Sequence, residues 1–285
     1  MSKTYVLYNP KSNSGQGKTE AEAVKQYIQG EIEFVDAFAE GGYVKFLERT
    51  TEEDTVVLCG GDGTLNRFIN DTDGTTVKPK MLYFATGTGN DFLNDLGLKT
   101  GCAPVELNKY LVGLPTVTVK GKEQKFINGI GFGIDGYCCQ VGDEQHAAGV
   151  EKVNYTSIAI KGLLFHYKPT NAKVTVDGVT KEYKKVWLAP TMNGRYYGGG
   201  MIPTPAQDRL NNDTVSTLVF YGKGKIKTLM AFPSIFKGEH ILHKDMVEIL
   251  VGKQVKVEFD RPTALQIDGE TVLDVTSYEV KTKAV

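Results

Sequence analysis

An aspartate inside a glycine-rich turn is the first feature of this sequence that suggests chemistry. The turn, Gly60-Gly61-Asp62-Gly63-Thr64, lies in the segment GGDGTLN, and its paired glycines let the backbone approach a ligand closely. Asp62 would repel a phosphate held there, so we expect either a Mg²⁺ ion between the two or a carboxylate that accepts a proton. The alternative is an ordinary turn in which Asp62 caps the helix that starts near Thr64.

Two other turns are similarly rich in small and polar residues. The segment NPKSNSGQGKT, Asn9 to Thr19, ends like a P-loop, but Ser12 stands where that motif has its first glycine. The simplest alternative is a polar turn between a strand and a helix. A third turn is GTGNDF, residues 87–92. If each turn follows a strand of one parallel sheet, their N–H groups and helix N-termini lie along one edge, which suits a polyphosphate.

The sequence patterns typical of metal sites, disulfides and dinucleotide-binding loops are incomplete in this chain. The cysteine spacing indicates neither a zinc site nor a disulfide, so we expect all four to be reduced: Cys59, Cys102, Cys138 and Cys139. His240 and His243 could share a helix face, but no third ligand is evident. The segment GFGIDG, residues 131–136, fits the dinucleotide pattern G-x-G-x-x-G, but no β-α-β unit is expected around it.

Composition limits the class of protein. The 285 residues suffice for two domains, and 41% hydrophobic with 24% charged residues is typical of a globular protein. Lys and Arg number 33 against 34 Asp and Glu, which gives no electrostatic reason to expect nucleic acid as a partner. No apolar run approaches the roughly 20 residues of a membrane-spanning helix, and no signal peptide is evident. We therefore expect a cytoplasmic protein.

The elements that must position these turns follow from hydrophobic periodicity. In the first half, strands are predicted at residues 4–9, 31–38, 54–60 and 79–86, alternating with helices at 18–30, 41–50 and 64–72. This alternation predicts a parallel sheet with helices on both faces, and ligands of such sheets lie beyond the carboxyl ends of the strands.

From about residue 115 the pattern changes. Residues 115–133, 171–194, 213–224 and 253–275 alternate apolar and polar residues between turn signals, which predicts antiparallel strands and a sandwich. Helical stretches interrupt them at about 153–166 and 225–240. The aromatic-rich segment NYTSIAIKGLLFHY, residues 154–167, could line a lipid cleft or touch a membrane, or it could simply pack half-buried on the sandwich.

The three turns, in their order along the chain, resemble those of the diacylglycerol kinase and sphingosine kinase superfamily, and most closely its soluble bacterial branch. The likeness continues in NGIGFGIDG (128–136), NGRYYGGGM (193–201), PSIFKGEH (233–240) and LQIDGE (265–270), and so covers nearly the whole chain. It implies an α/β nucleotide-binding domain at 1–115 and a β-sandwich domain at 116–285, with the active site between them. The extreme C-terminus could return to the first domain.

By position, the resemblance implies ATP contacts in all three turns. Thr88 is one contact, and Asn90 and Asp91 support its turn. The remaining expected contacts lie in the first loop and the main phosphate loop: Asn9, Pro10, Lys11, Ser12 and Asn13, then Gly60, Gly61, Asp62, Gly63, Thr64, Leu65 and Asn66.

The resemblance also implies a catalytic carboxylate in the segment IDGE. A lipid hydroxyl becomes a nucleophile as its proton passes to a carboxylate, while Mg²⁺ carries phosphate charge. We expect Asp268 to be this base, with Glu270 as the alternative or as an assisting group. Without the resemblance, IDGE is typical of a hairpin turn.

Two departures from the family pattern concern charge. The family often has Glu after GGDGTLN, whereas this chain has Arg67, a cation that could touch phosphate. Many bacterial members hold a structural Mg²⁺ through a DDG segment, and this chain has RLNNDTVS there, with Asn211 and Asn212 before Asp213. Asp213 or Asp208 could still ligate magnesium through oxygen atoms.

Together these features predict an ATP-dependent lipid kinase with Mg²⁺, acting on the hydroxyl of a membrane-derived lipid such as diacylglycerol. Its partner would be a lipid at the membrane surface, met peripherally and transiently, and a homodimer is left open. Two alternatives remain. The acceptor could be a sphingoid base, phosphatidylglycerol or NAD, since NAD kinases share the GGDGT loop. The chain could also bind nucleotide without transferring phosphate.

Overall fold

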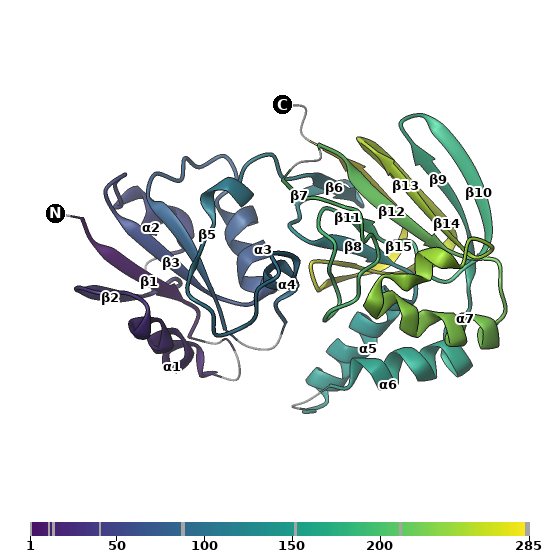
Figure 1. The fold of residues 1–285 in the computed structure, drawn as a ribbon, viewed down its shortest axis with the longest axis horizontal. Helices are drawn as coiled ribbons and strands as arrows, with labels where there is room; N and C mark the ends of the chain where they lie inside the picture. Colours follow the sequence, from purple (N-terminus) through teal and green to yellow (C-terminus); the bar gives the residue numbers. More distant parts are fainter. Residues whose placement is uncertain are drawn as a thin grey trace. The chain divides into compact units, whose positions relative to one another are not determined.

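The computed structural model describes residues 2–10, 12, 15–39, 41–86, 89–150, 153–210 and 213–282. It contains two compact units, Met1–Val112 and Gly113–Val285 (Figure 1). The change of unit falls three residues before the boundary that the sequence pattern suggests. Strand β15 (Glu270–Lys281) stays in the sheet of the second unit. No helix among the described residues is long and apolar enough to cross a membrane.

The first unit is an α/β layer structure. Its five-stranded sheet has the order β2-β1-β3-β4-β5, in which β5 alone runs antiparallel. The strands are β1 Thr4–Tyr8, β2 Ile32–Asp36, β3 Thr55–Gly60, β4 Lys80–Ala85 and β5 Val105–Glu106. The helices are α1 Gly17–Glu22 with the 3₁₀ turn η2 Ala23–Gln26, α2 Tyr43–Glu48, α3 Asp62–Asp71, α4 Asp91–Asp95 and the 3₁₀ turn η3 Asn108–Tyr110.

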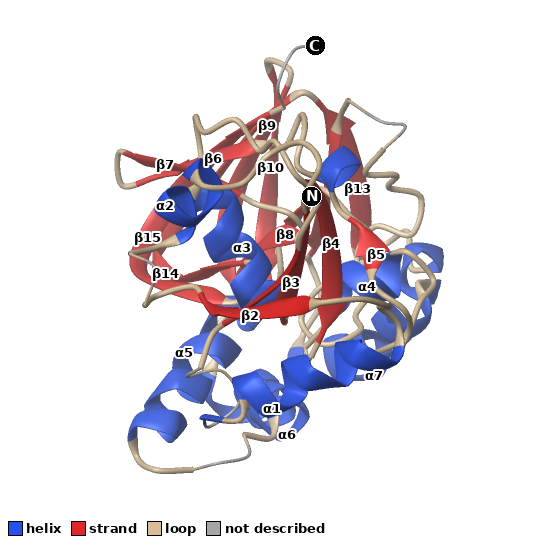
Figure 2. Cartoon of the chain, turned by 90° about the vertical axis from the view of Figure 1, so that its left-hand side faces the viewer, coloured by secondary structure: helices blue, strands red, loops and turns tan. Residues whose placement is uncertain are grey.

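Helices cover both faces of this sheet because successive residues of a strand point to opposite sides. Val6 packs with Ala21 and Val24, which places the α1–η2 segment on one face. Its neighbour Tyr5 meets the ring of Phe46 of α2 edge-on at 5.4 Å, on the other face. Helices α2 and α3 lie together on that side (Figure 2). The predicted doubly covered sheet is therefore confirmed.

The second unit is built on a ten-stranded antiparallel sheet. The main path runs β13-β12-β11-β8-β14-β15-β6-β7, and the β9–β10 hairpin joins it through β14. The strands before β15 are β6 Thr116–Val119, β7 Lys122–Lys125, β8 Gly129–Phe132, β9 Thr170–Val176, β10 Val179–Val186, β11 Thr191–Met192, β12 Val215–Phe220, β13 Val247–Gly252 and β14 Gln254–Ile267.

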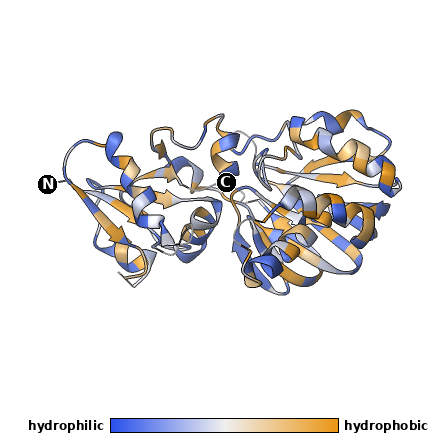
Figure 3. Ribbon diagram, turned by 90° about the horizontal axis from the view of Figure 1, so that it is seen from below, coloured by the Kyte–Doolittle hydropathy of each residue, from blue (hydrophilic) through white to orange (hydrophobic). Residues whose placement is uncertain are grey.

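Helices of the second unit lie together on one side of its sheet (Figures 1 and 3). They are α5 Ile134–Ala147, α6 Tyr155–Lys161, the π-helical turn η4 Gly162–His166, α7 Lys225–Ala231 and the 3₁₀ turns η5 Phe232–Lys237 and η6 Glu239–Leu242. Helix α5 was not expected from the sequence, which favoured strands up to residue 133. It begins directly after Gly133, which has φ +125° and no room for a Cβ beside the Trp187 carbonyl.

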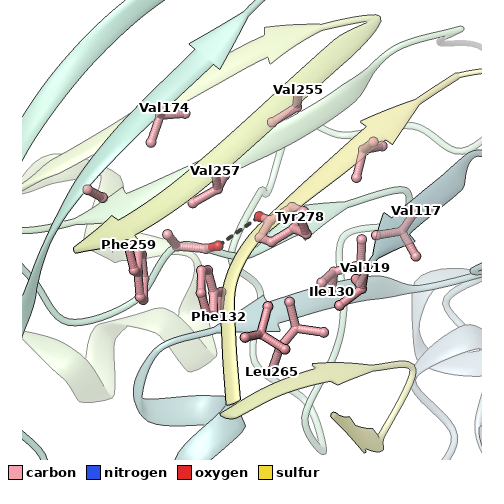
Figure 4. Packing of buried hydrophobic residues seen from close by; sticks show 14 of the residues in the cluster. Val117, Val119, Ile130, Phe132, Val174, Val255, Val257, Phe259, Leu265 and Tyr278 are labelled. Atoms are coloured by element: carbon pink, nitrogen blue, oxygen red, sulfur yellow. Dashed lines mark hydrogen bonds between the residues drawn. The ribbon is translucent and has the colours of Figure 1, made fainter. Parts of the chain in front are cut away.

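The core of the sandwich lies where the long strand β14 changes partners. Before an irregularity at residues 258–263, β14 pairs with β9, and after it with β8. The sheet thereby folds over on itself, and Phe132 of β8 stacks on Phe259 of β14 at 3.7 Å between ring centroids. Tyr278 fills the same cluster (Figure 4), and its hydroxyl lies 3.0 Å from the Ala189 carbonyl, to which it donates a hydrogen bond.

Candidate functional site

The first turn of the first unit is folded tightly on itself. The hydroxyl of Ser12 donates to the carbonyl of Asn9 at 2.8 Å, and the Ser12 N–H donates to the same oxygen at 3.1 Å. A Cβ at Gly17 would overlap that carbonyl, so the start of α1 needs glycine there. Pro10 lies in the turn, half-buried, while Lys11 and Asn13 lie outside the described residues.

The main loop leaves β3 through two glycines, the first without space for a side chain and the second with little. A Cβ at Gly60 would overlap the side chain of Thr64, and one at Gly61 would lie 3.0 Å from the carbonyl oxygen of Gly89. Helix α3 therefore begins immediately after the strand. Its first-turn N–H groups, including that of Gly63, have no partner within the helix by position. Such a helix start favours a bound anion.

Asp62 links two of the turns. Its carboxylate accepts the N–H of Asp91 at 2.6 Å and that of Phe92 at 3.2 Å, which caps helix α4 rather than its own helix. The Asp62 N–H in turn donates to the carbonyl of Gly89. The predicted capping role is thus found on the neighbouring helix, and the charge of Asp62 serves to hold the GGDG and GTGND turns together. Thr88 lies outside the described residues.

A buried tyrosine supports this junction from below. The hydroxyl of Tyr83 lies 3.0 Å from the Gly60 carbonyl and 3.3 Å from Asn90 Oδ1, and it can donate a hydrogen bond to either oxygen. Burial, reinforced by the charge of Asp62, raises the pKa of Tyr83 well above its usual value, so it remains a donor. Tyr83 was not predicted as a site residue, because it lies inside a strand and matches no motif.

The remaining residues of the main loop and the one after it have contacts within the first unit. Leu65 is fully buried, and Asn66 is buried with its Oδ1 accepting from Asn70. Arg67 forms an ion pair with Asp71 at 3.3 Å. Its guanidinium also lies 4.4 Å from the ring centroid of Phe38. These contacts hold Arg67 along the helix surface.

In the second unit, the segment IDGE forms the two-residue hairpin between β14 and β15. Ile267 pairs with Glu270, and both intervening residues have positive φ, +46° at Asp268 and +96° at Gly269. This is the backbone that Asp-Gly favours in tight hairpins. The Gly269 N–H donates to Gln266 Oε1 at 2.7 Å, which fixes the turn further.

The carboxylate of Asp268 is buried and accepts three backbone N–H groups. They come from Ile127 at 2.7 Å, Asn128 at 2.8 Å and Gly129 at 2.9 Å. The Asp268 N–H donates to the Gly129 carbonyl at 3.0 Å. Charge-assisted bonds of this kind stabilise the ionised carboxylate and occupy its lone pairs. Asp268 therefore anchors the hairpin to the start of β8.

Two further side chains, those of Asn193 and Arg209, bind the same segment. Asn193 Nδ2 donates to the Ile127 carbonyl at 2.9 Å, and Arg209 Nη1 donates to that carbonyl at 3.0 Å. Arg209 Nη2 also donates to Asn128 Oδ1 at 3.1 Å. The structure thus brings together four separate motifs of the sequence, and Arg209, which sequence reasoning missed, joins them. Its signal was its place directly after Asp208, in the segment where metal ligands were expected.

Glu270 differs from Asp268 in being exposed. It is the first residue of β15 and directly follows the hairpin that Asp268 holds. Its carboxylate is therefore accessible to a substrate, while the backbone that carries it is fixed.

The residues expected to hold a metal have other partners. Asp213 forms an ion pair with Lys253, whose hydrogen bond lowers the pKa of that carboxyl. Asp208 Oδ1 accepts the Leu210 N–H at 2.9 Å. Among the described residues, no three His, Cys, Asp or Glu side chains form a group that could hold a metal ion. Asn211 and Asn212 lie outside that part of the chain. Magnesium ligation by Asp208 or Asp213 therefore stays a prediction.

One buried acid was not anticipated. Asp135, at the start of α5, lies against Gly131, where a Cβ would overlap its Oδ2. Burial raises the pKa of Asp135 to about 7. The N–H of Gly136 and the hydroxyl of Tyr197 face it without reaching hydrogen-bond geometry. The glycines of GFGIDG therefore make room for this acid and for the Trp187 backbone. A strand and a helix do flank them, but β8 pairs only antiparallel.

Comparison with known proteins follows the two units. The diacylglycerol kinase catalytic domain model matches residues 3–118, and the model of the YegS C-terminal NAD kinase beta sandwich-like domain matches residues 128–283. The chain is 28% identical to a diacylglycerol kinase of Mycobacterium tuberculosis over 212 residues, 72% of this chain and 67% of the relative. It is 22% identical to a diacylglycerol kinase of Bacillus subtilis, with 95% and 90% covered.

A solved structure shows the same fold. The crystal structure of a diacylglycerol kinase from Bacillus anthracis superimposes with a TM-score of 0.63 at 18% identity, covering 98% of this chain and 93% of that one. Both domain models match in the expected order, and the sandwich model alone spans more than half of the chain. The chain therefore belongs to the diacylglycerol kinase family of phosphotransferases, in the branch with a YegS-type β-sandwich domain.

Proposed function

We propose that this protein transfers the γ-phosphoryl group of ATP, taken as its magnesium complex, to the hydroxyl of a membrane-derived lipid such as diacylglycerol. The observation that carries the proposal is the link made by Asp62. One carboxylate joins two glycine-rich turns at the carboxyl ends of β3 and β4, within a matched diacylglycerol kinase catalytic domain. Rigid turns of this kind present backbone N–H groups to phosphate oxygens at little reorganisation cost.

The nucleotide contacts that we propose are the first turn, Asn9 to Asn13, the main loop from Gly60 to Asn66, and Thr88. Backbone groups carry most of this role, because Leu65 and Asn66 are buried and the carboxylate of Asp62 is occupied by Asp91 and Phe92. Arg67 lies outside our proposed contact set, since Asp71 and Phe38 hold it.

For the proton acceptor, the geometry favours Glu270 over Asp268. Three N–H donors occupy the Asp268 carboxylate, whereas the Glu270 carboxylate is exposed. In the proposed step, the lipid hydroxyl oxygen forms a bond to the γ-phosphorus as the bond to the β,γ-bridging oxygen breaks. The hydroxyl proton passes to Glu270, and ADP leaves. Asp268 acts as a positioning residue that fixes the hairpin.

A second acceptor class has one observation in its favour. The matched sandwich model is described as NAD kinase-like, so NAD is the alternative soluble acceptor. The names of the curated relatives favour a lipid.

Labelled ATP offered with diacylglycerol, sphingosine, phosphatidylglycerol or NAD in detergent micelles tests the proposal. We expect label in phosphatidic acid, and a loss of about 10²-fold or more in kcat for Glu270→Gln with little change in nucleotide affinity. Label in NAD alone would assign the alternative acceptor. Nucleotide binding without transfer to any acceptor would show that this chain is not a kinase.

A further inference from the structure

The helical side of the second unit exposes large apolar side chains. Four of them are more than 70% exposed: Phe165 at 72%, Ile226 at 73%, Met230 at 78% and Leu242 at 74%. Scattered apolar residues on a surface need no explanation, but a contiguous group marks an interaction site.

Two of the helical segments are in direct contact. Lys225 Nζ, at the start of α7, donates to the carbonyl of Leu164 in the π-helical turn at 2.7 Å. Phe165 and Ile226 are the next residues after this bonded pair. Met230 follows Ile226 by four residues on α7, so the two lie on one face of that helix. We name Phe165, Ile226 and Met230 the apolar ridge.

The ridge lies opposite a shared core. Leu163 of the π-helical turn, Ala231 of α7 and Ile235 of the following 3₁₀ turn are buried in one hydrophobic cluster with Trp187. Both segments therefore use one side to pack on the sheet, which leaves the ridge on the side that faces solvent. In Figure 3 these helices carry apolar stretches in orange interrupted by hydrophilic ones.

The formal charges within the two segments that carry the ridge are all positive. Residues 153–168 and 222–238 contain no Asp or Glu, in a chain whose acids and bases are balanced. Their lysines are Lys161, Lys168, Lys223, Lys225, Lys227 and Lys237. Acids do face them from neighbouring elements: Asp245 pairs with Lys223 at 3.0 Å and lies within electrostatic reach of Lys227. Asp143 of α5 lies near Tyr155 of α6, and Glu239 follows the second segment. Lys161 and Lys227 are exposed and form no ion pair among the described residues.

A hollow beside the ridge is basic as well. It has a volume of about 220 Å³ and is lined by His166, Lys168, Arg261 and Gln140 among others. Arg261 donates to the Lys168 carbonyl, and its guanidinium lies 5.8 Å from the ring centroid of Tyr167. The hollow has the size and charge for a phosphate-bearing headgroup next to Phe165.

We propose that this face is where the protein docks on an anionic phospholipid bilayer. The apolar ridge enters the boundary between headgroups and acyl chains, and Lys161, Lys168 and Lys227 contact lipid phosphates, as in amphipathic segments that lie on membranes. A two-fold contact between copies of the chain is disfavoured, because residues 153–168 and 222–238 carry six lysines and no acid, so the contact would bring like charges together. The proposal rests on the proposed function only in taking a membrane lipid as the acceptor.

Sedimentation with sucrose-loaded vesicles tests this docking without any turnover. The full chain should bind vesicles of equal parts phosphatidylglycerol and phosphatidylcholine at about 0.1 M salt, and bind less at 0.5 M, where screening is stronger. Substituting the ridge, Phe165→Ser with Ile226→Ser and Met230→Ser, should weaken binding at least about tenfold. The double variant Lys161→Glu with Lys227→Glu should weaken it about 25-fold or more, at about fivefold per lysine.

Matched controls are Val179→Ser, which removes a side chain 66% exposed on β10, and Lys122→Glu on β7. Both should bind vesicles as the unaltered protein does. The docking proposal is overturned if the unaltered chain fails to bind, if the ridge variant binds equally well, or if the ridge variant instead converts a dimer to a monomer.

Micelle activity separates this proposal from the proposed function. Detergent micelles deliver the lipid without a bilayer, so ridge variants should keep their kcat there. If the unaltered protein shows no kinase activity in micelles but binds vesicles through the ridge, the proposed kinase function is refuted and the docking face is not. If the unaltered protein is active in micelles but the ridge variant binds vesicles equally well, the docking face is refuted and the kinase function is not.

Discussion

We propose that Asp268 positions the hairpin and that Glu270 accepts the proton, and these separate roles can be tested by substituting each residue. Asp268→Asn keeps the hairpin backbone, because Asn-Gly favours the same positive φ values as Asp-Gly. It removes the charge and turns an amide NH₂ toward at least one of the three N–H donors. A hydrogen bond to a charged group contributes about 1.5–3 kcal/mol, and a buried donor left without a partner costs about 1–3 kcal/mol. We expect a loss of about 2–4 kcal/mol in the free energy of unfolding.

Glu270→Gln is the matched control in stability and the decisive variant in activity. Its side chain is exposed, so its effect on stability should stay within about 0.5 kcal/mol. For a unit of this size, about 2–4 °C of Tm corresponds to 1 kcal/mol. The Tm should therefore fall by about 5–15 °C in Asp268→Asn and by no more than about 2 °C in Glu270→Gln.

Activity must be read at a temperature where both variants are folded. Glu270→Gln should lose about 10²-fold or more in kcat, and Asp268→Asn should lose activity together with its stability. The reasoning is refuted if Glu270→Gln turns over at the unaltered rate. It is refuted equally if Asp268→Asn melts normally yet loses kcat, since Asp268 would then act on the proton itself.

Three further predictions concern Asp135, Asp62 and Gly17. Burial raises the folded-state pKa of Asp135 to about 7. The free energy of unfolding of the unaltered protein should therefore fall as the pH rises from about 4 to 7. Asp135→Asn should be more stable than the unaltered protein by up to about 4 kcal/mol at pH 8, and this difference should vanish near pH 4. Urea unfolding across this range checks it, and a pH-independent difference would contradict it. Asp62→Asn should cost about 1–3 kcal/mol and speed amide hydrogen exchange at Asp91 and Phe92; unchanged exchange there would argue against the link. Gly17→Ala should weaken MgATP binding, measured by calorimetry, because its Cβ would overlap the Asn9 carbonyl. Gly89→Ala should fold normally, because a Cβ there meets open space. Equal MgATP affinity in Gly17→Ala and the unaltered protein would show that this turn does not bind nucleotide.

Local patterns predicted most of the first unit. Its strands have runs of β-branched and apolar residues, such as Thr55–Gly60, and glycine-rich turns or proline follow them. The alternation of strands and helices along the chain was therefore predicted, but the order of the strands in the sheet was not. The predicted helices came out shorter, as at α1 and α2, where 3₁₀ turns or loops take over. Strand β5 escaped notice because it has only two residues.

The second unit was predicted as a class but not in its details. Helix α5 and strand β13 were missed. Helix α5 follows a glycine turn inside a run that resembles strands, and its cysteines and glycines give a weak amphipathic pattern. The segment of β13, VEILVG, lies between a helical stretch and the next predicted strand, where no turn signal separated it.

The sequence by itself determined which motifs the chain carries: the three glycine-rich turns of the first unit, the Asp-Gly hairpin of the second, and their order along the chain. Only the tertiary structure decided what each carboxylate does. Asp62 caps a helix that begins 29 residues later, and Asp268 accepts N–H groups from a segment up to 141 residues away. The physical reason is that turn geometry and periodicity depend on neighbouring residues, whereas a carboxylate takes its function from the donors that folding brings to it.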